Sequence, residues 1–256
     1  MSPRLAFAVD AALRAGRSTL AHFQTGAAVD LKSDDSPVTI ADRHAERMIR
    51  EGIERWYPDD AILGEEEGER GESPNRWVID PIDGTKSFIC GVPLYGTLLA
   101  YEEAGHPVLG VCYFPALDEM LYAERGAGAF WNGRPCRVSE KFDIKGSVIC
   151  GGGHRTMADQ GRMEPFLDLA ELAMATRTWS DAYGHALVAT GRVEAMIDPT
   201  VQRWDVSAMK VIVEEAGGMM TDFAGGDALH PKANGCLEVV SSNGRVHEEL
   251  LEAFGR

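Results

Sequence analysis

The chain has 256 residues, of which 45% are apolar and 25% are charged, a balance typical of a globular protein with a substantial core. Its 40 acidic residues outnumber its 25 basic ones, and the resulting net charge of −15 disfavours binding to a nucleic-acid polymer. No apolar run approaches the roughly 18 residues of a membrane span, and five scattered cysteines without a CxxC pair argue against a disulfide framework or a structural zinc. We therefore expect a cytoplasmic protein with no membrane partner.

The first half of the chain has the pattern of two helices followed by a mostly antiparallel sheet. Apolar residues at helical spacing predict helices over 3–24 and 39–57. Short β-like runs follow at 61–64, 76–80, 96–103, 107–114, 119–124 and 129–131. Ala104-Gly105-His106 separates two of these runs and predicts a hairpin.

The second half alternates strands with helices. Strands are predicted at 147–150, 177–180, 193–197, 219–221 and 237–241, and helices at 159–176, 181–191, 205–216 and 246–254. This alternation favours a layered α/β unit. We place a boundary near residue 145, which divides one compact unit into an N-terminal α+β subdomain (1–145) and a C-terminal α/β subdomain (146–256).

The densest group of polar residues follows a short apolar run in WVIDPIDGT, residues 77–85. We expect the strand to end at Asp80, because Pro81 stops further pairing, and Asp83 follows within three residues. Such a corner can aim two carboxylates and the Ile82 carbonyl at one point, and these oxygen ligands suit a hard cation such as Mg2+. In isolation the two carboxylates could instead build an Asx turn.

The end of the same motif favours an anion beside the cation. Gly84 and Thr85 open a turn or short helix, and their amides would face an anion at a helix N-terminus. A metal and a phosphate at one corner are the requirements of phosphoryl transfer.

Further charged residues occupy positions that each have a structural explanation. Glu65 lies in an acidic run after a strand, which is often a solvated loop, and Asp205 stands where a helix cap is expected. Asp42 belongs to a sequence typical of a capping box, and Lys32 lies in a polar loop. Taken singly, these residues do not distinguish a structural role from a functional one.

Three motifs together resemble the inositol monophosphatase family: WVIDPIDGT, GEE at 64–66 and WD at 204–205, in this order. The agreement in order and spacing covers about residues 30–220, and the terminal helices also fit. The resemblance implies an α-β-α-β-α sandwich, a homodimer, and hydrolysis of a small phosphorylated metabolite with two to three Mg2+ ions per active site.

The resemblance also implies roles for single residues. The metal-binding groups would be Glu65, Asp80, the Ile82 carbonyl, Asp83 and Asp205. Thr85 matches the threonine that activates the attacking water together with Glu65, and the amides of Gly84 and Thr85 match those that hold the phosphate. Lys32 and Asp42 match a lysine and an aspartate beside a third cation site, although the interval between them is one residue shorter than in inositol-specific members.

The segment WSDAYGH at 179–185, followed by ALVATGR, most resembles the histidinol-phosphate phosphatase members, which act in histidine biosynthesis. KSDDSPVTIAD and KSFICGVPLYGTLLA agree with this. Asp181 and Asp198 could offer carboxylates to an ammonium group, while Trp179 or Tyr183 could flank an imidazole. The segment can also be interpreted as a strand end and a helix cap.

Three other functions remain open. An inositol or broad sugar phosphatase would share every metal ligand, and a phosphoadenosine phosphatase would need a larger pocket for the base. A binding protein that has lost catalysis is disfavoured, because every matched carboxylate and Thr85 are present.

Overall fold

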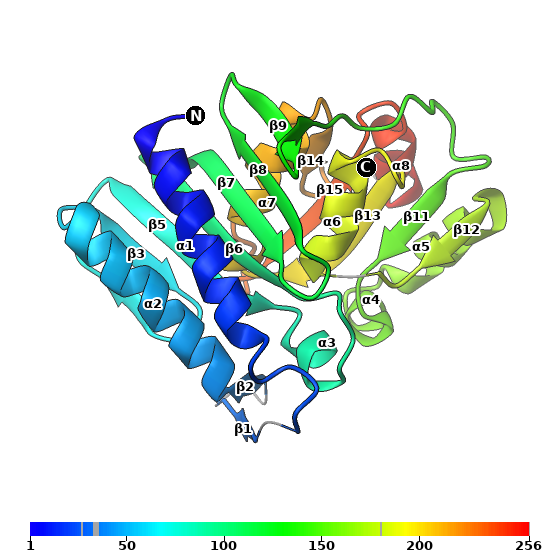
Figure 1. Cartoon of the computed structure of the whole chain (residues 1–256). Coiled ribbons are helices and arrows are strands. Elements are labelled where there is room, and N and C mark those ends of the chain that lie inside the picture. Colours follow the sequence, from blue (N-terminus) through cyan, green and yellow to red (C-terminus); the bar gives the residue numbers. More distant parts are fainter. Residues whose placement is uncertain (27, 33–35, 180, 256) are drawn as a thin grey trace.

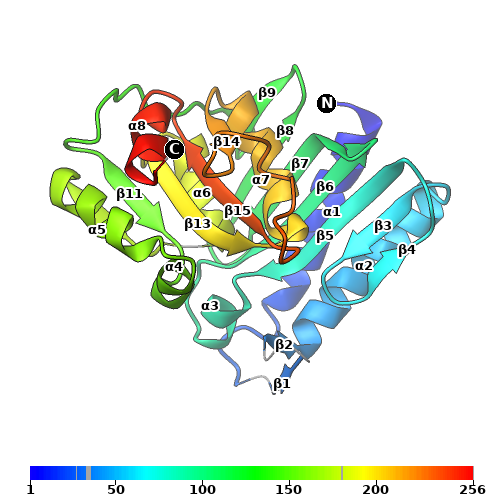
Figure 2. The ribbon, with the colours of Figure 1, turned by 180° about the vertical axis from the view of Figure 1, so that it is seen from behind.

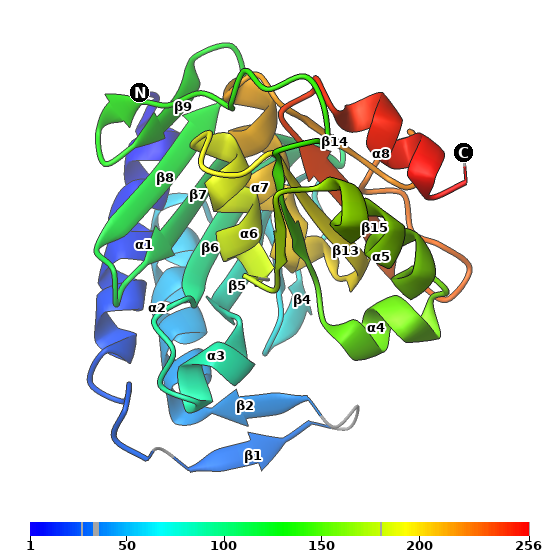
Figure 3. The same ribbon diagram turned by 90° about the vertical axis from the view of Figure 1, so that its right-hand side faces the viewer.

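The structure, a computed structural model, describes residues 1–26, 28–32, 36–179 and 181–255. Its helices and sheets stack in five layers: helices, sheet, helices, sheet, helices (Figure 3). This arrangement confirms the layered α-β-α-β-α sandwich expected from the sequence. No helix in the described part of the chain is both long and apolar enough to cross a membrane.

The first layer consists of α1 (Pro3–Thr19) and α2 (Ile40–Trp56) (Figure 1). The Ser2 hydroxyl accepts the Leu5 N–H at 3.1 Å and so caps α1. The predicted helix over 3–24 was too long, because α1 ends at Thr19 and turns follow. Thr39 and Asp42 form the capping box of α2, as the sequence predicted.

The second layer is a sheet of eight strands within the described residues, in the order β10-β9-β8-β7-β6-β5-β3-β4. The strands are β3 (Ala61–Gly64), β4 (Gly68–Arg70), β5 (Asn75–Asp83), β6 (Gly96–Glu103), β7 (His106–Phe114), β8 (Glu119–Glu124), β9 (Gly128–Trp131) and β10 (Arg134–Pro135). All neighbours are antiparallel except β3 and β5, which run parallel. The predicted hairpin between residues 96 and 114 is present.

The fourth layer is a smaller sheet in the order β12-β11-β13-β15-β14. Its strands are β11 (Val148–Gly151), β12 (Ala175–Arg177), β13 (Ala195–Val201), β14 (Met219–Thr221) and β15 (Leu237–Ser242). Outside it lie α4 (His154–Asp159), α5 (Met163–Leu172) and α8 (His247–Ala253), seen from behind in Figure 2.

The middle layer consists of α6 (Asp181–Ala189) and α7 (Arg203–Glu215), which lie between the two sheets. Apolar residues of both helices and both sheets form one continuous buried cluster. The expected boundary near residue 145 falls in the connection from β10 to β11, yet α7 packs closely on β7 of the larger sheet. This shared cluster therefore joins the two predicted subdomains, whose separation stays a prediction.

Two predicted elements of the second half were wrong in their bounds. The helix expected over 159–176 is shorter and corresponds to α5, which begins at Met163 and ends at Leu172. Gly161, with a positive φ of 66°, separates it from α4, which was not predicted. The strand expected over 177–180 lies earlier, as β12, and residue 180 lies outside the described residues.

β5 is longer than the sequence predicted. The strand does not end at Asp80 but continues to Asp83, with a register shift between these two residues. The irregularity accommodates Pro81, which has no N–H for a regular ladder, and the Pro81 carbonyl accepts the Thr97 hydroxyl at 2.8 Å. Below this end of the strand in Figure 1 lie α3 (Thr85–Ile89) and the small hairpin β1 (Val29–Leu31) and β2 (Pro37–Thr39).

Candidate active site

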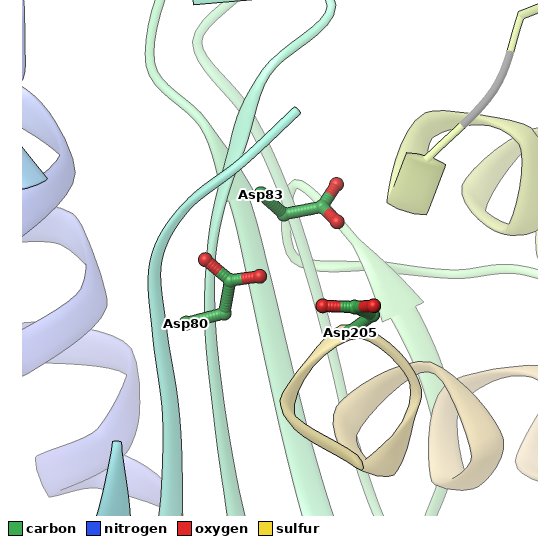
Figure 4. A group of neighbouring side chains, drawn as sticks. All are labelled: Asp80, Asp83 and Asp205. Carbon is green, nitrogen blue, oxygen red and sulfur yellow. The ribbon is translucent and has the colours of Figure 1, made fainter. Parts of the chain in front are cut away.

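Three carboxylates converge where β5 ends and α7 begins. Asp80, Asp83 and Asp205 each offer an oxygen atom within 4.8 Å of the others' (Figure 4). The irregular end of β5 supplies the first two, and Asp205 lies in the first turn of α7, where it also accepts the Gln202 N–H at 2.7 Å. Asp205, which lies 122 positions after Asp83 in the chain, thus joins Asp80 and Asp83 in one acidic cluster.

Local backbone geometry at Gly84 brings the end of the DPIDGT segment, residues 80–85, close to Asp181. Gly84 adopts a left-handed conformation with φ of 77° before α3. A Cβ at this position would lie 3.0 Å from an Asp181 carboxylate oxygen, so only glycine fits without displacement. The close approach links the end of β5 to the start of α6.

Glu65 occupies the turn between β3 and β4, beside the same cluster. The Lys32 ammonium lies 2.7 Å from Glu65 and 2.8 Å from Glu66, so the predicted lysine and the predicted glutamate are paired. A cavity of about 190 Å3 opens here, lined by all five predicted metal-binding residues. Gly84, Thr85 and Asp181 line the same cavity.

The pKa values of the clustered carboxylates show that their negative charges need to be neutralised. Burial, reinforced by the charges of Glu65 and other neighbouring carboxylates, raises the pKa of Asp80 well above its ordinary value. Asp83 is affected in the same way, chiefly by burial and then by Asp181, and burial raises the pKa of Asp205 to about 7. Crowding several carboxylates out of water is unfavourable unless protons or metal ions neutralise them.

One buried oxygen identifies where a cation would fit. Asp80 Oδ1 is buried and has no hydrogen-bond partner among the described residues. Asp83 and Asp205 offer carboxylate oxygens close to Asp80, and Ile82 lines the same cavity. Ligands that are all oxygen atoms are typical of sites for Mg2+. The residues present therefore fit a hard divalent cation.

Thr85 lies between the cluster and the first layer of helices. Its hydroxyl donates to the Ile82 carbonyl at 3.1 Å and lies 3.5 Å from Asp42 Oδ1. The other Asp42 oxygen accepts the N–H and hydroxyl of Thr39 at 2.8 and 2.6 Å. Asp42 thus caps α2 and also contacts Thr85, which lines the cavity. Its structural and functional interpretations are therefore compatible.

The structure brings two of the four predicted substrate-binding residues to the cavity. Asp181 lines both the main cavity and an adjoining one of about 80 Å3, which Asp198 also lines. Tyr183 instead packs edge-on against Phe114 with ring centroids 5.0 Å apart. Trp179 is 39% exposed, lines neither cavity, and has its ring beneath the Arg177 guanidinium.

Lys86 is a cavity residue that was not predicted from the sequence. This exposed lysine lines the main cavity directly after Thr85, and its charge opposes the burial that raises the pKa of Asp181. A basic residue following DPIDGT was visible in the sequence. A positively charged side chain is expected beside a bound phosphate, and this expectation could have identified Lys86 in the sequence.

The site and the layered fold together define an acidic, oxygen-donor hydrolase centre, and comparisons with known proteins specify the class. The model of the inositol monophosphatase family matches residues 1–256. The chain belongs to this metal-dependent family and is a phosphatase of the phosphomonoesterase class, acting on small phosphorylated substrates.

Individual relatives cover all or nearly all of the chain. A histidinol-phosphatase of Chlorobaculum parvum is 43% identical, with 100% of this chain and 98% of the relative covered. A fructose-1,6-bisphosphatase/inositol-1-monophosphatase of Thermotoga maritima is 36% identical over 97% of this chain and 94% of the relative. Among solved structures, extragenic suppressor protein suhB of Bartonella henselae has a TM-score of 0.92 and 32% identity, with 100% and 99% of the two chains covered.

Proposed function

We propose that the chain is a Mg2+-dependent histidinol-phosphatase. The observation that carries the metal dependence is the buried carboxylate cluster with the unpartnered Asp80 Oδ1. Two to three Mg2+ ions would be held by the following groups: Glu65, Asp80, the Ile82 carbonyl, Asp83 and Asp205. When bound, the ions supply charge that lets a phosphate dianion enter an acidic cavity and that stabilises its reaction with water.

The chain's own groups would orient the substrate and the water. Thr85, positioned by Ile82 and Asp42, would together with Glu65 hold and deprotonate the attacking water. The Gly84 and Thr85 amides and the Lys86 ammonium would hold the phosphate oxygens. Lys32 and Asp42 would flank a third, weaker cation position, and the contact of Lys32 with Glu65 supports this placement.

The proposed substrate follows from the acidic wall beyond the phosphate position. Asp181 and Asp198 line the adjoining cavity, where a substrate ammonium would meet them. Burial raises the pKa of Asp198 to about 8, so a bound ammonium would favour its ionised form. The 43% identity to a protein named histidinol-phosphatase supports the same choice.

A phosphate-release panel tests the function. Purified protein with Mg2+ should show a higher kcat/KM for L-histidinol phosphate than for inositol 1-phosphate or phosphoadenosine phosphate. The metal cluster treats the three phosphates alike, so discrimination must come from groups that meet the rest of the molecule. A preference for inositol 1-phosphate would favour the alternative supported by the Thermotoga maritima relative and reject histidinol phosphate as the substrate.

We further propose that the protein is a cytoplasmic homodimer, following the family resemblance. Leu167 and Leu172 on α5 and Met174 before β12 are 56%, 59% and 66% exposed, and such apolar side chains support an interface on this face. Light scattering at micromolar concentration should give about twice the chain's mass. A monomer over the whole concentration range would contradict the homodimer.

A further inference from the structure

The buried carboxylate of Glu46 lies against the turn that carries Glu65. Glu46 is on α2 and has no exposed surface. One of its oxygens accepts the Glu66 N–H at 2.7 Å. The other accepts the Glu67 N–H at 3.0 Å and the Arg50 Nε at 2.7 Å. Both carboxylate oxygens are therefore occupied by donors, two of which belong to the turn.

The turn is held from the opposite side as well. The Glu65 N–H donates to the Ile79 carbonyl of β5 at 3.1 Å. The peptide before Glu65 is thus bonded to the strand that carries Asp80, and the peptide after it is bonded to Glu46. These two attachments leave the Glu65 backbone little freedom to shift relative to the acidic cluster.

Gly64 shows how closely the turn and α2 approach each other. A Cβ at this position would overlap the Glu46 carboxylate and would also lie 2.6 Å from Arg50 Nη2. The first residue of the GEE motif must therefore lack a side chain for Glu46 to reach the amides beyond it. The glycine and the buried glutamate form one arrangement.

We propose that Glu46 is a positioning residue that fixes Glu65 in the geometry needed to bind Mg2+. This inference rests on the proposed function, in which Glu65 is a metal ligand. Asp42, one helical turn earlier on the same buried face of α2, lies beside Thr85. A single helix thereby sets the position of two groups assigned to the reaction.

Replacement of Glu46 by glutamine should disrupt this arrangement although it preserves size. An amide group has one accepting oxygen and one donating nitrogen. Whichever way it is oriented, its nitrogen would face an N–H donor that the carboxylate now accepts. The turn would have to move away, and loss of an outer partner of a metal ligand commonly weakens metal binding about tenfold to a hundredfold.

The test is calorimetric titration of Mg2+ into the full-length, metal-free protein without substrate. Glu46→Gln should bind Mg2+ at least about tenfold more weakly than the unmodified protein, and half-activating Mg2+ should rise by the same factor. Glu194→Gln is the matched control. Glu194 is also buried, accepts the Val148 N–H at 2.7 Å and pairs with Lys141, but it lies directly before β13 of the smaller sheet. It should leave Mg2+ affinity unchanged.

Glu46→Asp provides a second variant in case the glutamine variant does not fold. It keeps the charge opposite Arg50, but its carboxylate is one methylene too short to reach both amides, so the same weakening is expected. Equal Mg2+ affinity in the unmodified protein and in either folded variant would overturn the inference while leaving the proposed function intact. Absence of Mg2+ binding by the unmodified protein would overturn both.

Discussion

At the scale of single residues, Asp80 has opposite effects on stability and on the proposed activity. Its carboxylate is 1% exposed, surrounded by other carboxylates, and has one oxygen without a partner among the described residues. In the metal-free protein this arrangement is unfavourable, because like charges are held together away from water. Asp80 is therefore retained at a cost in stability, a pattern typical of functional sites.

Asp80→Asn should separate the two effects. The amide preserves size but removes a ligand charge, so we expect loss of most phosphatase activity at saturating Mg2+. Because the repulsion is also removed, the Tm measured in EDTA should be equal to or higher than that of the unmodified protein. Near-full activity at saturating Mg2+ would show that the assignment of the metal ligands is wrong.

Asp198→Asn should distinguish a substrate contact from a structural role. A charge-assisted hydrogen bond contributes roughly 1.5–3 kcal/mol, which corresponds to about tenfold to a hundredfold in kcat/KM. The kcat/KM for histidinol phosphate should fall by this factor, whereas the kcat/KM for an aryl phosphate whose aryl group carries no charge should stay the same. Both are measured side by side at saturating Mg2+. Equal losses on the two substrates would mean that Asp198 supports the fold or the metals.

At the scale of elements, the site depends on where helices and strands end. The end of β3, the irregular end of β5, and the first turns of α2, α6 and α7 all meet there. The cap of α2 shares a residue with the site, since Asp42 bonds Thr39 and lies near Thr85. Element ends are where backbone groups lack partners, so polar side chains gather there naturally.

Asp42→Asn should affect stability and activity together, but moderately. Loss of the carboxylate from the capping box should lower the free energy of unfolding by about 1 kcal/mol. Activity should fall less than in Asp80→Asn, because the proposed third cation position is weak. Urea unfolding and phosphate release on one preparation measure both effects. A loss of activity as complete as that of Asp80→Asn would place Asp42 among the principal ligands.

In the middle layer, the buried His185 of α6 should make the stability of the protein depend on pH. Burial lowers the pKa of His185 to about 4 from its ordinary 6.5, and its ring is 2.7 Å from the Ser241 hydroxyl. Between these pH values the unfolded chain binds a proton that the folded chain excludes. Protonation of the unfolded chain should therefore lower the free energy of unfolding as the pH falls below 6.5. The loss due to His185 should reach about 3 kcal/mol near pH 4.

His185→Asn should remove that contribution. Urea unfolding at several pH values from 4 to 7 should give a shallower decline of the free energy of unfolding for the variant than for the unmodified protein. The carboxylates present in both chains cancel in this comparison. Parallel curves would show that His185 is not the group responsible.

At the scale of the whole molecule, cation binding should couple to global stability. The site draws ligands from both halves of the chain, and the two sheets share the buried cluster around α6 and α7. An ion bound only by the folded state stabilises it by about 2.7 kcal/mol at a hundred times Kd. For a chain of this size we expect a rise in Tm of about 5–10 °C on adding Mg2+ to metal-free protein.

The same samples should lose phosphatase activity in EDTA and regain it with Mg2+. Oxygen-only ligands do not hold zinc preferentially, so Mg2+ should suffice without Zn2+. Matched additions of NaCl at the same ionic strength control for screening. Phosphatase turnover that persists after exhaustive chelation of metal ions would rule out the proposed mechanism.

The sequence by itself determined most of the longer elements and the motif residues of this protein, but not short strands such as β1, β2 and β4. Local signals sufficed for the capping box at Thr39, the hairpin between β6 and β7, and the carboxylates of the DPIDGT corner. Each depends on neighbours in the chain, where spacing and residue type define the chemistry. The bounds of β5 were misjudged because a proline in a strand reads as a stop unless the pairing irregularity is known.

Only the tertiary structure decided which of these residues meet. Asp83 and Asp181 are 98 positions apart, yet the Ala182 N–H donates to Asp83 at 2.7 Å, so α6 is attached directly to the acidic cluster. Tyr183, two residues from Asp181, is directed into the core instead, because successive positions on a helix face different sides. The proposed role of Glu46 was equally hidden, since the backbone amides that it accepts lie about 20 residues away and nothing in its own segment distinguishes it from a solvated glutamate.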